Sequence, residues 1–483
     1  MLRLKHYNLL TISFDESMKT LSNHFFLSWI NFWVFVFSVS VFALGSHGGE
    51  AAIILFLTMI YIFLTKKETQ LKHSLSKNEI IFITLVFLFW FLNLLNTIFQ
   101  PNGLEYENLR VALSAMDNPM RWLLMLPLYF LFRRYKLDWK LLSIGLSLGV
   151  FISVGIASYE VNFLGYSRAS GGMNHEITFG QLMVATDLIL WVFMIYAWHN
   201  NNKFLATILL ISSLVAFYGS LLSVTRGAWL AYIFMILSFI IYTIKRSFFN
   251  KNYLFSKPVL LRIFLAFIVF FLVSQTSQYN TIKARTINSI DFVTTKGKSN
   301  IWGSEGLRID IYKTALEVSR NFPFGVGPDN FQNGAKAVVI LDALNNTSIQ
   351  VIRDDNTLLN IEDLKGEINN FKSLQSHYPN MGAIKYTARW DHAHNEWLNV
   401  LAENGIAGII LLTFLFAFPL KIFWQNLSHQ NELAGMYSYC GILLVVSFAI
   451  FAQTETIFAS HTIVIFFIFF LFLFIAQISR LVK

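Results

Sequence analysis

The chain has 483 residues, of which 55% are hydrophobic and only 13% are charged, and its mean hydropathy is +0.53. A soluble globular domain carries roughly a quarter charged residues, so this composition excludes a soluble enzyme and predicts a polytopic membrane protein. The single cysteine, Cys440, lies inside an apolar run, which excludes an intrachain disulfide and a cysteine-based metal site. The net charge of +9 could suggest a nucleic-acid ligand, but its distribution along the chain favours membrane orientation instead.

The apolar runs predict an all-α protein. The first run is too long for the apolar region of a signal peptide and lacks a small-residue cleavage site, so we expect a retained first span. The runs at 51–64 and 121–132 are short for roughly 30 Å of hydrocarbon, so each is expected to extend into its flanks or to lie at the interface. About twelve spans are predicted, near 25–44, 51–64, 80–99, 121–132, 140–159, 177–198, 203–222, 227–244, 259–276, 398–424, 434–454 and 460–481.

Lysine and arginine residues are distributed unevenly between the two sides of these spans. If the N-terminus is cytoplasmic, the clusters at 66–77, 133–140 and 245–262 all fall on the cytoplasmic side. Basic residues concentrate on that side of a membrane protein, so we predict cytoplasmic termini, a bacterial inner membrane and a periplasmic location for the long polar segment. The short outer connections carry only Arg110, Arg121, Arg168 and Arg226.

Three regions follow from this plan. Residues 1–276 form an N-terminal transmembrane region of about nine spans, 277–397 a large periplasmic loop between spans nine and ten, and 398–483 a C-terminal transmembrane region of about three spans. Within the loop, the apolar spacing of residues 306–318 predicts an amphipathic helix, and a Gly/Pro turn follows it. The part of the loop at 335–390 is assigned no role.

A histidine lies where the loop meets the tenth span. A helix beginning near Asp391, with Asp391 as N-cap, would place His394 in its first turn on the same face as Leu398. The positive end of the helix dipole would keep the imidazole neutral, and a neutral imidazole can accept a proton from an incoming hydroxyl. The alternative is that His392 and His394 are interfacial polar residues without a chemical role.

Two arginines on the predicted outer side could accompany this histidine. Arg226 begins a span, and Arg308 lies in the first turn of the loop helix. A snorkelling side chain at the headgroups and a solvated helix charge are the alternatives. Together, two guanidinium groups can hold a diphosphate and stabilise it as a leaving group, so that a nearby histidine completes an acyl- or glycosyl-transfer site.

Other chemistries have weaker support in the sequence. It contains no GxxxxGK[ST] loop and no HExxH motif. Asp187, Glu455 and Asn93 are polar residues in or beside apolar runs and could serve a transporter. Carboxylate pairs at 354–355 and 362–363 lack regular ligand spacing, so no metal site is predicted.

Three stretches together resemble the O-antigen ligase / O-antigen polymerase superfamily of bacterial envelope proteins. Ser223–Trp229 is similar to its Ser-x-x-Arg-Gly segment, and Arg308 through 323–327 to its arginine, helix and Pro-x-Gly-x-Gly segment. His392–Asn395 through Glu403–Gly408 is similar to its His-x-His-Asn and Glu-x-Gly-x-x-Gly signature. The resemblance covers most of the chain from about residue 170 onward.

The resemblance implies transfer of a glycan from undecaprenyl diphosphate to an acceptor on the periplasmic face, with no cofactor and no metal. In the ligases of the family the acceptor is a sugar hydroxyl of the lipid A–core oligosaccharide. Carried over to this sequence, His394 would be the general base, and Arg226 and Arg308 would bind the diphosphate while the anomeric centre is inverted. The supporting residues would be His392, Asn395 and Glu403.

The motifs leave the acceptor open. Relatives in the superfamily transfer glycans to pilin or other proteins, or polymerise repeat units, and the segment 335–390 could provide surface for a protein acceptor. A function of a different class, a transporter of lipid-linked sugars, could use the same two arginines. We predict an O-antigen ligase of undetermined oligomeric state, with no nucleic-acid partner.

Overall fold

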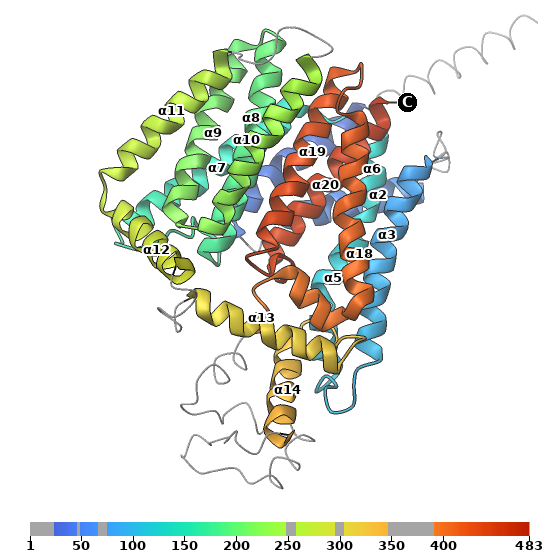
Figure 1. Ribbon diagram of the computed structural model, residues 1–483. Helices are drawn as coiled ribbons and strands as arrows, with labels where there is room; N and C mark the ends of the chain where they lie inside the picture. The colour runs from blue at the N-terminus through green and yellow to red at the C-terminus, as the bar shows by residue number, and fades with distance from the viewer. Residues whose placement is uncertain are drawn as a thin grey trace, which may run out of the picture.

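A computed structural model describes residues 24–45, 49–65, 75–247, 257–294, 304–345 and 391–482. The regular structure within these ranges is helical, which confirms the all-α prediction. The helices form an elongated bundle, and α13 (Ser304–Asn321) and α14 (Phe331–Asn345) lie at the end opposite the C-terminus (Figure 1). We call this end the α13 end.

Helix composition identifies a multi-pass membrane protein. Among the described residues, eight helices are long and apolar enough to cross a membrane, and the bent pair Pro258–Ser274 and Gln278–Asp291 would make a ninth. The two helices of this bent pair are α11 (Lys257–Ser274) and α12 (Ser277–Thr294). The eight are His24–Ala43, α3 (Lys77–Ile98), α7 (Trp139–Asn162), α8 (Glu176–His199), α9 (Lys203–Ser223), α18 (Glu396–Asn426), α19 (Glu432–Phe451) and α20 (His461–Leu481).

The prediction of twelve spans is thus supported for eight or nine. The remaining predicted runs also fold as helices, but one of them is broken in the middle. Pro127 lies in the first turn of α6, where its missing N–H prevents continuation of the preceding helix. The helices formed by the remaining predicted runs are α2 (Glu50–Thr65), the consecutive α5 (Asp117–Leu124) and α6 (Leu126–Arg134), and α10 (Arg226–Ser247).

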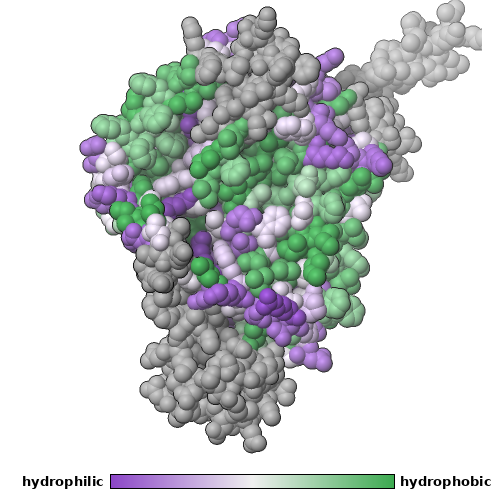
Figure 2. All heavy atoms as spheres, in the orientation of Figure 1, coloured by the Kyte–Doolittle hydropathy of each residue, from purple (hydrophilic) through white to green (hydrophobic). Residues whose placement is uncertain are grey.

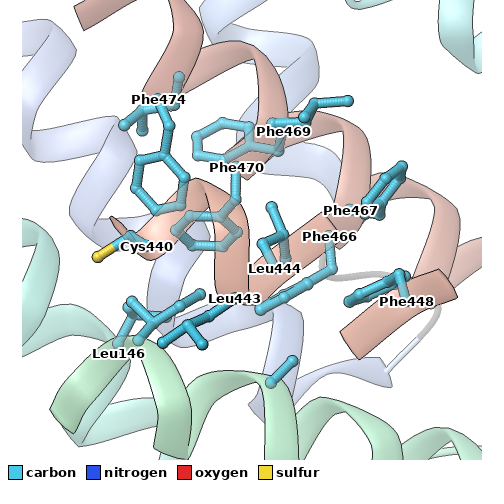
Figure 3. Packing of buried hydrophobic residues seen from close by; sticks show 14 of the residues in the cluster. Leu146, Cys440, Leu443, Leu444, Phe448, Phe466, Phe467, Phe469, Phe470 and Phe474 are labelled. Atoms are coloured by element: carbon cyan, nitrogen blue, oxygen red, sulfur yellow. The ribbon is translucent and has the colours of Figure 1, made fainter. Parts of the chain in front are cut away.

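Helix α20 lies in the centre of the core. Its most apolar 18-residue window is 94% buried, as expected for a helix that is hydrophobic on every face. Its phenylalanines interlock with other helices, since the ring of Phe469 stacks on Phe37 with centroids 3.7 Å apart. Phe467 likewise stacks on Phe448 of α19 at 4.6 Å (Figure 3). This packing fixes the short segment before α20, which reaches the α13 end.

Polar contacts join the helix ends at the end opposite α13. Gln477 accepts a hydrogen bond from the Leu137 N–H at 3.2 Å, and Arg133 Nε lies 2.5 Å from Glu79 Oε1. The basic cluster 133–140 therefore lies far from α13 and its arginine Arg308. The visible surface has apolar side chains across its middle and hydrophilic ones along α13 (Figure 2).

The polar segment after α11 contains helices, as predicted. Helix α13 buries Ile311, Ala315 and Val318 in a small core of its own, which it shares with Phe331 of α14. The amphipathic helix predicted at 306–318 is therefore confirmed. The carboxylate pairs at 354–355 and 362–363 lie outside the described residues.

Candidate active site

The helix predicted to begin near Asp391 begins instead at Glu396, so the placement of His394 in a first helical turn was wrong. Asn395 is the N-cap, and its side-chain oxygen accepts the Leu398 N–H at 3.1 Å. His394 precedes the helix with φ +49°, in the left-handed region. Asparagine is as good an N-cap as aspartate, so composition alone does not choose between the two starts.

Tertiary hydrogen bonds decide the start of the helix. The Glu396 N–H donates to the Ala452 carbonyl at 2.8 Å, and Asn395 Nδ2 donates to the Gln453 carbonyl at 3.0 Å. The segment before α18 is thereby tied to the turn that follows α19. The Tyr312 hydroxyl of α13 donates to the His394 carbonyl at 3.3 Å, which fixes the backbone of the histidine from a third direction.

His394 lies against a carboxylate. Its Nδ1 is 2.7 Å from Glu455 Oε1, and Arg308 Nη2 is 3.7 Å from Glu455 Oε2. A carboxylate only accepts hydrogen bonds, so the hydrogen bond assigns the proton of a neutral His394 to Nδ1 and leaves the lone pair on Nε2. His394 thus has the orientation and the tautomer that a general base needs.

The charges around Glu455 keep it ionised. Burial raises the pKa of this carboxyl. The hydrogen bond from His394 and the electrostatic attraction of His394, His392 and Arg308 lower it by more than burial raises it, so its pKa lies below the ordinary value of 4.5. His392 Nδ1 is 3.9 Å from the same oxygen, and the two imidazole rings meet edge to face with centroids 4.5 Å apart. Burial lowers the pKa of His392, and protonation of His394 would lower it further, which favours the neutral form of His392.

Glu455 was considered at the sequence level only as a transporter residue. The predicted span 434–454 ends just before Glu455. This boundary could have placed Glu455 at the membrane surface, on the side where the predicted span 398–424 begins and where His394 lies. The side chains of the other two residues considered for transport have partners within the helix bundle. Asp187 is ion-paired with Arg262 at 2.5 Å, and Asn93 Nδ2 donates to the Phe89 carbonyl at 2.8 Å.

Arg226, at the start of α10, has its guanidinium against α12. Its Nη1 donates to the Arg285 carbonyl and to the Ser289 hydroxyl of α12. The next residue, Gly227, packs so closely on the turn after α19 that a Cβ there would lie 2.5 Å from Thr454 Oγ1. The structure therefore brings Arg308 and His394 to one carboxylate. It places the start of α10 next to Thr454, the residue before Glu455, while the Arg226 guanidinium contacts α12.

The glycines of the two C-terminal motifs contact one another. The Val326 N–H donates to the Ala402 carbonyl at 3.0 Å, and Gly327 N–H to the Glu403 carbonyl at 2.9 Å. Gly325 and Gly405 have φ of +93° and +64°, and a Cβ on either would collide with the backbone of the other motif. The turn after α13 thus docks on a kink in α18 at Gly405, and Glu403 lies buried at this kink.

Three side chains of the site could hold a metal ion. The candidate ligand atoms of His392, His394 and Glu455 lie within 4.8 Å of one another. However, the 2.7 Å hydrogen bond between His394 and Glu455 already joins two of these atoms, and Arg308 brings its positive charge to the carboxylate. The geometry fits a hydrogen-bonded pair better than a cation site, and the absence of a metal stays a prediction.

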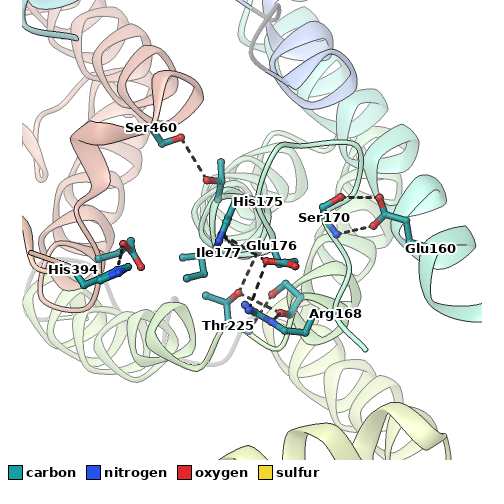
Figure 4. Close-up of polar contacts among 12 residues, drawn as sticks. Glu160, Arg168, Ser170, His175, Glu176, Ile177, Thr225, His394 and Ser460 are labelled. Atoms are coloured by element: carbon teal, nitrogen blue, oxygen red, sulfur yellow. Dashed lines mark hydrogen bonds and ion pairs between the residues drawn. The ribbon is translucent and has the colours of Figure 1, made fainter. Parts of the chain in front are cut away.

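The polar residues at the start of α8 lie across from His394. Figure 4 shows His175, Glu176 and Arg168 grouped there, with Thr225 beside them and His394 on a separate segment. The Thr225 hydroxyl donates to the Glu176 carbonyl at 3.2 Å, and Thr178 and Ser460 hydroxyls are 3.4 Å apart. These contacts hold α8 and α10 against the segment that carries Glu455.

Comparison with known proteins gives two findings. Residues 210–361 match the family model described as O-antigen ligase (Wzy_C), which confirms the resemblance inferred from the motifs. The matched range contains Arg226 and Arg308 and ends before His394. The chain is also 23% identical over 433 residues to an uncharacterized protein of Haemophilus influenzae, covering 89% of this chain and 94% of that protein.

Proposed function

We propose, from the premise that residues 210–361 carry an O-antigen ligase family domain, that this chain transfers an O-antigen glycan from undecaprenyl diphosphate to the lipid A–core oligosaccharide. The family indicates glycan transfer of the O-antigen ligase type with a lipid-linked substrate. The observation that carries the finer proposal is the contact of His394 and Arg308 with the single carboxylate of Glu455.

His394 acts as the general base. As the acceptor hydroxyl attacks the anomeric carbon, its proton passes to His394 Nε2. The bond between that carbon and the diphosphate oxygen breaks, and the diphosphate leaves with the electron pair. Attack opposite the leaving group inverts the anomeric centre. Glu455 stabilises the resulting imidazolium through Nδ1, which is the role of the carboxylate in comparable pairs.

The arginines act on the leaving group. Arg226 and Arg308 bind the diphosphate and stabilise the charge that develops on it, because a guanidinium stays protonated and donates in a planar fork. Neutral His392 and Asn395 orient the acceptor side, and Glu403 supports the kink in α18 on which α13 docks. No step of this mechanism requires a metal or a cofactor.

The membrane supplies proximity. Donor and acceptor are lipids confined to one leaflet, which raises their effective concentration at the site. We place the α13 end in the periplasm of a bacterial inner membrane and both termini in the cytoplasm, because the basic cluster 133–140 lies at the opposite end of the bundle.

Transfer by the purified protein in detergent tests this proposal. The full chain is incubated with undecaprenyl-diphosphate-linked glycan and, separately, with lipid A–core, pilin or a second lipid-linked repeat unit. Glycosylated lipid A–core is the expected product. Product only with pilin or with the repeat unit would reassign the acceptor. No product in any reaction would contradict glycan transfer. Transport would then remain as the alternative function, because detergent removes the two compartments between which transport is measured.

A further inference from the structure

A third arginine lies at the α13 end, in the loop between α7 and α8. The side chain of Arg168 is 19% exposed, its Nε donates to the Ser223 carbonyl at 3.0 Å, and its Nη1 is 3.6 Å from Glu176 Oε2 (Figure 4). Within the described part of the chain, its other terminal nitrogen, Nη2, has no hydrogen-bond partner. Arg168 is therefore held through Nε and Nη1 and can still donate from Nη2.

The loop that carries Arg168 is fixed from α7. The Glu160 carboxylate accepts the Ser170 N–H at 2.6 Å, the Ser170 hydroxyl at 2.8 Å and the Gly171 N–H at 2.9 Å. Gly171 has φ +59°, and a Cβ there would collide with the Phe179 ring of α8. An ordered loop loses little conformational entropy when its side chains bind a ligand, so this loop is suited to binding.

Arg168 shares its surroundings with Arg226. Ser223, whose carbonyl accepts from Arg168, precedes Arg226 by three residues at the corner between α9 and α10. Burial lowers the pKa of Arg168, the Glu176 carboxylate opposes this effect, and the positive charge of Arg226 lowers the pKa further. Two guanidinium groups and one carboxylate leave a net positive charge, which favours an added anion.

We propose that Arg168 and Arg226 form a phosphate-binding position on the α8–α10 side of the site, which holds the lipid-proximal phosphate of the diphosphate donor. This inference rests on the proposed function, since it assigns a further residue to the same donor. Arg308, on α13, then faces the phosphate nearer the sugar. Glu176 competes with the donor for Arg168 and is displaced when the donor binds.

Binding of undecaprenyl diphosphate to the purified full chain in detergent tests the assignment. Arg168→Gln is expected to weaken binding about tenfold or more, as for loss of a charge-assisted hydrogen bond. Arg168→Lys keeps the charge but loses the fork, so a smaller loss is expected. The control is Arg110→Gln, which removes an exposed arginine of α4 (Leu109–Ala115) and is expected to bind like the wild type.

A second variant separates binding from a structural role. Glu176→Gln removes the competing carboxylate, so binding of undecaprenyl diphosphate is expected to tighten. If the ion pair of Arg168 and Glu176 only stabilises the fold, Glu176→Gln weakens binding as Arg168→Gln does, and this result would overturn the proposal. Unchanged binding by Arg168→Gln, or no binding of undecaprenyl diphosphate by the wild type, would overturn it as well.

The outcome is distinguishable from that of the proposed function. Failure of glycan transfer by a wild type that binds undecaprenyl diphosphate through Arg168 would reject the reaction and keep the phosphate position. Normal transfer with no effect of Arg168→Gln on binding would reject only the phosphate position. If Arg168→Gln melts early in detergent, Arg168→Lys, which retains a donor for the Ser223 carbonyl, and Glu176→Gln decide the question.

Discussion

Glu455 determines which nitrogen of His394 carries the proton. The contact of 2.7 Å involves Nδ1, so the acceptor meets Nε2. The carboxylate is charged at neutral pH, since its pKa lies below the ordinary value.

Replacing Glu455 with glutamine should slow turnover. A carboxamide can still accept the Nδ1–H hydrogen bond but cannot stabilise the imidazolium, so we expect kcat to fall about 10- to 100-fold with a smaller change in donor KM. Steady-state glycan transfer measures both constants. Glu317→Gln, at an α13 glutamate whose side chain is 46% exposed, is the matched control. Equal kcat for Glu455→Gln and this control would remove Glu455 from the mechanism.

His392 makes stability depend on pH. Its pKa in the folded protein lies below 6.5, mainly because the imidazole is buried. Above pH 6.5 neither the folded nor the unfolded state binds this proton, and as the pH falls the unfolded state binds it first. Stability is therefore lost between pH 6.5 and the lowered pKa. Glu455 adds nothing in this window, because its lowered pKa affects stability only below about pH 4.5.

Melting temperatures in detergent between pH 7.5 and 5.5 check this expectation. On acidification the melting temperature of the wild type should fall relative to that of His392→Asn, which has no group to protonate at this position. Parallel curves for the two proteins would show that His392 does not carry the effect.

At the scale of elements, the sequence motifs predicted which segments converge but not how they are built. The helix at 306–318 and the turn at Gly325 were recognisable from spacing and composition, and Gly405 from the resemblance to the family signature. The start of α18 was not recognisable. It is fixed by the carbonyls of Ala452 and Gln453, which are distant in sequence and accept hydrogen bonds from the Glu396 N–H and the Asn395 side chain. The run at 121–132 was counted as a span, although Pro127 divides it into two short helices.

Gly405 tests the docking of α13 on α18. Gly405→Ala introduces a side chain at φ +64°, where it would collide with the backbone around Pro323, so we expect a loss of about 1–3 kcal/mol in stability and of most transfer activity. The control is Gly155→Ala in α7, where a Cβ would meet nothing within 4 Å. Thermal unfolding and transfer assays compare the two variants. A Gly405→Ala protein as stable and active as Gly155→Ala would contradict the docking.

At the scale of the whole molecule, folding gathers distant parts of the chain at one end of a membrane bundle. Arg308 comes from α13, His394 from the segment before α18 and Glu455 from the turn after α19. Composition was sufficient to predict a multi-pass helical protein. It was insufficient for Glu455, because a carboxylate beside an apolar run has the same sequence signature whether it lies within the membrane or at its edge.

The central claim is that His394 is the base of a glycan transfer, and one measurement tests it most directly. Wild type and His394→Ala are purified in detergent, shown to have the same melting temperature and binding of undecaprenyl diphosphate, and compared for product formation from lipid-linked glycan and lipid A–core in the presence of EDTA. We predict product with the wild type and a loss of at least about a hundredfold with His394→Ala. Product formation by His394→Ala at the wild-type rate would contradict the account.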